Sequence, residues 1–183
     1  MIRLSKAIAA RMRLAVRRMT GEEEGTATIE FVMFFPVFLT VFMSAFESGL
    51  LMTRQVMLER AIDVSVRELR LGWKPTHDEL KARICDVASV FPDCLDVVML
   101  ELRPVDTTTW SPLNTNITCV ERDAAIQPVT TFVQGAQNEM MLVRACAVFD
   151  PVFPLTGLGL NLAVDASGGY QLAASSAFVN EPD

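Results

Sequence analysis

GTATIEFVMFFPVFLTVFMSAFESG, residues 25–49, holds sixteen consecutive residues without a formal charge, from Phe31 to Phe46. Apolar side chains continue to Met52, so residues 29–52 give about 36 Å of helix at about 1.5 Å per residue. This length exceeds the roughly 30 Å hydrocarbon core of a bilayer. Because no Ala-x-Ala cleavage site closes the run, the pattern favours a permanent membrane anchor over a secretory signal peptide.

The charges before this run predict its orientation. Residues 1–20 carry six basic side chains and no acidic one. The positive-inside rule therefore places residues 1–25 in the cytoplasm, and the C-terminal part in the periplasm of a Gram-negative cell. The formal net charge of the whole chain is −6 although residues 1–20 carry only positive charges, so the rest of the chain is acidic. An acidic exported part argues against nucleic acid as a partner.

The apolar run is expected to belong to one helix over residues 26–71, within a transmembrane and amphipathic segment of residues 26–72. Pro36 should kink the helix because proline lacks a backbone donor and clashes with the preceding turn. Beyond Met52 the apolar residues recur at helical spacing, so the outer half of the helix should lie against a folded domain. Gly72 is expected to end the helix.

Residues 73–183 are expected to form a small periplasmic domain. Thr76-His-Asp-Glu79 has the pattern of a capping box and predicts the start of a second helix, closed by Pro92. Runs rich in β-branched and apolar residues predict strands, over residues 95–103, 117–120, 139–149 and 170–179. A helix followed by several strands predicts an α+β fold with an antiparallel sheet.

The four cysteines all fall in this expected domain, at Cys85, Cys94, Cys119 and Cys146. An even number in an oxidising compartment indicates disulfides, with three possible pairings. Local pairing needs the least excursion of the chain, which favours Cys85–Cys94 and Cys119–Cys146. A metal site fits less well, because there is no Cys-x-x-Cys pattern and the only histidine is His77.

Two glutamates, Glu30 and Glu47, stand at the ends of the apolar run, about 26 Å apart along a helix. Both can be explained as boundary residues, with Glu47 at the outer boundary where water solvates it. Glu30 gains weight from its offset to Gly25, since cleavage after Gly25 gives Thr26 an ammonium group that can neutralise a carboxylate in apolar surroundings. No nucleophile, base and oxyanion site come together in the sequence, so we expect neither an enzyme nor a cofactor.

A family resemblance rests on residues around the apolar run, namely Gly25, Thr26, Glu30, Phe31, Pro36, Glu47 and Gly49. Their pattern resembles the N-terminal signature of TadE-like pseudopilins of the tight-adherence (Flp-type) pilus systems, and TadF-like proteins share the same design. The resemblance covers residues 25–71 well and the remainder loosely. The major pilin of these systems is far shorter and usually has Glu-Tyr where this chain has Glu30-Phe31.

The resemblance implies a minor pilin or pseudopilin of the inner membrane that takes part in pilus assembly. A prepilin peptidase would cut between Gly25 and Thr26, and Glu30 and Phe31 would serve assembly. The implied partners are inner-membrane lipid, the peptidase, other pilins and the membrane proteins of pilus assembly. The alternatives are an uncleaved single-pass scaffold of a secretion complex and a membrane-anchored periplasmic enzyme.

Overall fold

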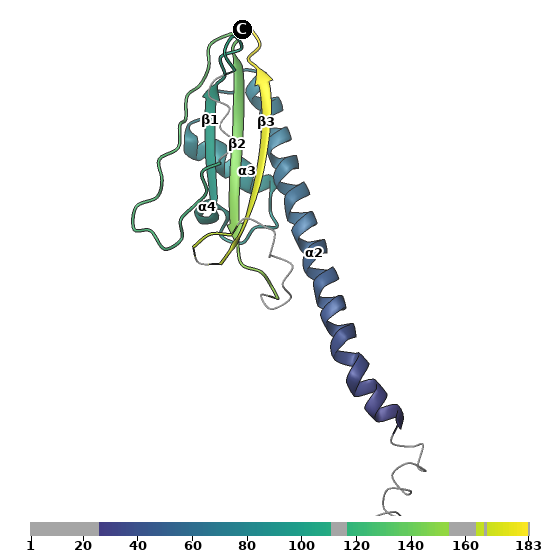
Figure 1. The fold of residues 1–183 in the computed structure, drawn as a ribbon. Helices are drawn as coiled ribbons and strands as arrows, with labels where there is room; N and C mark the ends of the chain where they lie inside the picture. Colours follow the sequence, from purple (N-terminus) through teal and green to yellow (C-terminus); the bar gives the residue numbers. More distant parts are fainter. Residues whose placement is uncertain (1–25, 111–116, 154–163, 167, 183) are drawn as a thin grey trace, which may run out of the picture. The chain divides into compact units, whose positions relative to one another are not determined.

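The structure is a computed structural model that describes residues 26–110, 117–153, 164–166 and 168–182. Its elements are α2 (Thr26–Arg70), α3 (His77–Val87), α4 (Cys94–Val97), β1 (Val98–Pro104), β2 (Met140–Phe149) and β3 (Tyr170–Val179) (Figure 1). The chain separates into two compact units, Met1–Met43 and Ser44–Asp183, and residues 44–70 of α2 belong to the second unit. A long helix followed by a domain with a helix and a sheet is the expected α+β class.

The sheet of the second unit has three antiparallel strands in the order β1-β2-β3. In the centre of the sheet, Leu100 lies opposite Ala145, which lies opposite Ala174. These residues belong to the core face, and all three are buried. Because side chains alternate between faces along a strand, the register of β2 places its Val143, Ala145 and Ala147 on that same face.

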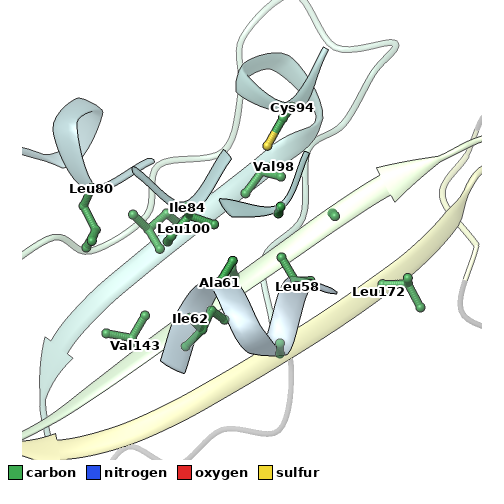
Figure 2. Packing of buried hydrophobic residues seen from close by; sticks show 14 of the residues in the cluster. Leu58, Ala61, Ile62, Leu80, Ile84, Cys94, Val98, Leu100, Val143 and Leu172 are labelled. Carbon is green, nitrogen blue, oxygen red and sulfur yellow. The ribbon is translucent and has the colours of Figure 1, made fainter. Parts of the chain in front are cut away.

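The outer part of α2 covers this face of the sheet. Leu58, Ala61 and Ile62 are almost completely buried, and Figure 2 shows them close to Val143 and Leu172 of the sheet. Each buried leucine or isoleucine side chain stabilises the fold by about 1.5–3 kcal/mol relative to an exposed one. The outer half of the helix is therefore part of the domain core, as its helical spacing of apolar residues predicts.

Helix α3 begins with the expected capping box. The hydroxyl of Thr76 accepts a hydrogen bond from the backbone N–H of Glu79 at 3.3 Å, and the carboxylate of Glu79 accepts one from the N–H of Thr76 at 2.7 Å. The helix ends at Val87 and does not continue to Pro92, because the chain leaves the helical conformation at Ala88. Leu80 and Ile84 are its buried residues.

Two predicted strands differ from the structure. The strand expected from residue 95 begins at Val98, because the amides of Asp96 and Val97 donate to the carbonyl of Asp93 and close a helical turn, α4. Residues 117–120 do not pair as a strand. They lie on the second face of the sheet, where Val120 packs against Met99 and Val148. The strands expected over residues 139–149 and 170–179 are confirmed as β2 and β3.

Both disulfides join residues of the second unit, with Cys85 bonded to Cys94 and Cys119 bonded to Cys146. This is the pairing that the shortest chain excursion favours. The first bridge connects α3 to α4. The second connects residues 117–120, which we call the covering segment, to β2. In β2, Cys146 is completely buried.

Candidate functional site: the apolar helix and the turn at its outer end

The first part of α2 is an apolar helix whose surface is not covered by protein. Helix residues Ala27–Arg70 contain an 18-residue apolar window of which none is buried. The side chain of Phe31 is 61% exposed, and ten further large apolar side chains between Ile29 and Phe46 are also exposed. Water is a poor solvent for a continuous apolar surface of this kind. Lipid or other apolar helices must therefore cover it.

At the inner end of this helix, Glu30 is exposed and Phe31 stacks on Phe35 with ring centroids 4.9 Å apart. Pro36 lies inside the helix, and the hydroxyl of Thr40 donates to its carbonyl at 2.9 Å. Helix α2 begins at Thr26. Gly25, on the other side of the expected cleavage site, lies outside the residues that the structure describes. The assembly role of Glu30 stays a prediction.

At the outer end of this helix, the environment of Glu47 differs from the one expected from the sequence. It is only 1% exposed. Its two carboxylate oxygens accept hydrogen bonds from consecutive backbone amides, from Val152 at 3.1 Å and from Phe153 at 3.0 Å. The expectation that water solvates Glu47 is therefore wrong, because a turn of the domain encloses the carboxylate. Two hydrogen bonds from consecutive amides to one carboxylate hold this turn against the helix.

Gly49, two residues further along the helix, is exposed, and a β-carbon added there would meet no atom within 4 Å. Its carbonyl accepts a hydrogen bond from the hydroxyl of Thr53 at 2.8 Å. Within the described chain, the packing does not demand a glycine at this position. Gly49 therefore leaves a flat place on the exposed surface of the helix.

The structure brings to Glu47 a group of residues that the sequence did not single out. The ring of Phe153 packs edge-on against that of Phe46, with centroids 6.0 Å apart. Arg54 lies two helical turns beyond Glu47, with its guanidinium carbon 4.3 Å from the ring centroid of Phe149. Phe149 ends β2, only a few residues before the turn. Nothing local in the sequence indicated that the segment after this strand would contact α2.

An ion-pair cluster stabilises the second face of the sheet, away from the core. Arg122 binds Asp150 at 2.7 Å and Asp165 at 2.9 Å, and the hydrogen bonds that its guanidinium donates to these carboxylates raise the pKa of the guanidinium. Asp165 also accepts a hydrogen bond from the amide of Gly169 at 2.6 Å. The ion pairs of Arg122 thus connect the loops that contain Asp150 and Asp165. Among the described residues, no group of three or more His, Cys, Asp or Glu side chains is placed to hold a metal ion.

These features define a class of protein. A long apolar helix without protein cover, followed by a small disulfide-bonded α+β domain, is the build of a protein anchored in a membrane by a single span.

The family comparison gives the second step. Residues 25–67 match the family model described as TadE-like protein, so the resemblance seen in the sequence is confirmed over this segment. The match begins at Gly25 and includes the apolar helix, Glu30, Glu47 and Gly49. Residues 68–183 lie outside it. No curated protein and no solved structure matches the chain. The comparison therefore shows a likeness to TadE-like proteins over residues 25–67.

Proposed function

We propose that the protein is a minor pilin or pseudopilin that takes part in assembling a tight-adherence (Flp-type) pilus. The observation that carries this proposal is the family match over residues 25–67, which begins at the glycine of the expected processing site. The uncovered apolar helix supports it, because such a surface can exchange lipid for neighbouring helices during assembly. The protein lies in the inner membrane, with residues 1–25 in the cytoplasm and residues 73–183 in the periplasm.

A prepilin peptidase removes the basic leader by cutting between Gly25 and Thr26. Cleavage creates a new ammonium group at Thr26, four residues before Glu30. A carboxylate near the edge of the hydrocarbon is costly unless a positive charge neutralises it. In a packed base of several subunits, the Thr26 ammonium of one subunit supplies that charge for Glu30 of the next. Phe31, exposed beside Glu30, adds apolar contact in the same place.

Processing can be tested by N-terminal sequencing of the chain purified from membranes of its own host. We expect Thr26 as the first residue, and a full-length chain when Gly25 is replaced by valine, because a peptidase cleft requires close backbone approach at this glycine. A chain that begins at Met1 in the unsubstituted protein would contradict processing. That result would instead support an uncleaved scaffold of a secretion complex.

Assembly can be tested with Glu30→Gln, which keeps the shape and removes the charge. We expect normal membrane insertion, since one charge fewer lowers the cost of transfer, and loss of crosslinking to pilus components. Asp63→Asn is the matched control, because Asp63 is an exposed carboxylate of the same helix outside the apolar run. Glu47→Gln is not a suitable control, since Glu47 is buried in the domain. Equal fibre counts for Glu30→Gln and Asp63→Asn would contradict the assembly role.

A further inference from the structure

We propose that the turn Val152–Phe153 is a second membrane contact, which rests on the outer leaflet of the bilayer at the boundary between headgroups and acyl chains. The inference rests on the membrane anchoring in the proposed function. It goes further, because it assigns a lipid-binding surface to the periplasmic domain itself.

The position of the turn is set by Glu47. Phe46 is the last residue of the uncharged run, and Glu47 follows it directly. Glu47 accepts hydrogen bonds from the backbone N–H groups of both turn residues. The turn therefore lies at the same depth as Glu47, where the chain leaves the hydrocarbon core of the bilayer. A carboxylate shielded in this way is not exposed to lipid, and the two amides have no need of water. The turn can therefore approach the bilayer without an unsatisfied backbone donor.

The side chains of the turn continue the apolar surface of the helix. Val152 is 48% exposed and Phe46 is 49% exposed. Phe153 joins them, because its ring packs against that of Phe46. Apolar side chains exposed next to a membrane-spanning helix lose contact with water when they enter the boundary between headgroups and acyl chains. The bilayer is thus the occupant that this surface fits, since Phe46 is itself the last residue of the uncharged run.

The contact can be measured on the full-length chain in vesicles of phosphatidylcholine and phosphatidylglycerol that contain phospholipids brominated high on the acyl chain. The test variant is Val152→Trp and the matched control is Val179→Trp. Both valines are 48% exposed. Val179 pairs with Met140 at the opposite end of the sheet, about 30 Å from Phe149 along β2. Emission from Trp73 and Trp110 is removed by subtracting the spectrum of the unsubstituted chain.

We expect the added fluorescence of Val152→Trp to fall to less than about half, because side chains at the boundary lie about 5–10 Å deep. Fluorescence of Val179→Trp should not change. Equal quenching of both variants, or no quenching of Val152→Trp, would overturn the contact.

The result does not depend on processing or on pilus assembly. The vesicles contain neither a peptidase nor other pilus proteins, so a chain that is never cleaved in its host still reports on the turn. Conversely, loss of quenching leaves N-terminal sequencing and the Glu30→Gln crosslinking experiment unaffected.

Discussion

Removing the disulfide between Cys119 and Cys146 should destabilise the domain and loosen one particular segment. The two cysteines are 27 residues apart. The chain-entropy relation for a loop of this length gives about 3–4 kcal/mol of stabilisation. The other bridge joins residues 9 apart and gives about 2.5–3 kcal/mol by the same relation. A small domain is typically stable by about 5–15 kcal/mol, so either loss is a large fraction of the total.

The location of the effect is as informative as its size. The Cys119–Cys146 bridge holds the segment that buries Val120 against Met99 and Val148 on the second face of the sheet. Without it, this segment should open before the core face, because α2 packs on the opposite side. We therefore expect faster amide exchange in residues 117–133 than in α3 when both cysteines are replaced by alanine.

The assay is urea unfolding of the full-length chain in detergent, followed by fluorescence of Trp73, which packs against the core cluster. Hydrogen exchange read by mass spectrometry gives the location. The control is the double alanine variant of Cys85 and Cys94, which should open α4 and leave the covering segment protected. A loss below about 1 kcal/mol for the Cys119–Cys146 variant, or exchange that rises first in α3, would refute the reasoning.

Three further predictions concern the ends and surfaces of the helices. Thr76→Ala should lower the free energy of unfolding by about 1 kcal/mol, because it removes the helix cap, and urea unfolding would show it. The hydrogen bond from Arg83 lowers the pKa of Glu68 in the folded protein. The pair therefore stabilises the fold fully above the ordinary carboxyl pKa, and this stabilisation is lost as pH falls through the lowered pKa of Glu68. Arg83→Gln should therefore flatten the acid limb of a stability–pH curve, and an unchanged limb would contradict the pair. Gly72 has a φ of 91°, so Gly72→Ala should cost about 1–2 kcal/mol in the same unfolding assay.

Much of the fold follows from local pattern. The uncharged run predicts the long helix, since its length and composition alone match a bilayer. The capping box predicts the start of α3 to the residue, because its hydrogen bonds connect positions three apart. The strands β2 and β3 are predicted almost to their ends, since each is a long run of apolar and small residues bounded by turns. The processing site and the assembly role of Glu30 rest on a short, fixed spacing and stay predictions.

Tertiary structure decided what depends on residues far apart in the chain. Residues 117–120 have the composition of a strand, but the bond from Cys119 to Cys146 makes them a cover for the sheet. Glu47 has the sequence position of a water-exposed boundary residue, yet its partners are amides 105 and 106 residues further along. Burial of a carboxylate is costly unless hydrogen-bond donors contact it in the folded protein. Donors so far away in the chain cannot be predicted from a local sequence pattern. The sequence therefore determined the anchor and the elements, and packing determined that the outer end of the anchor is built into the domain.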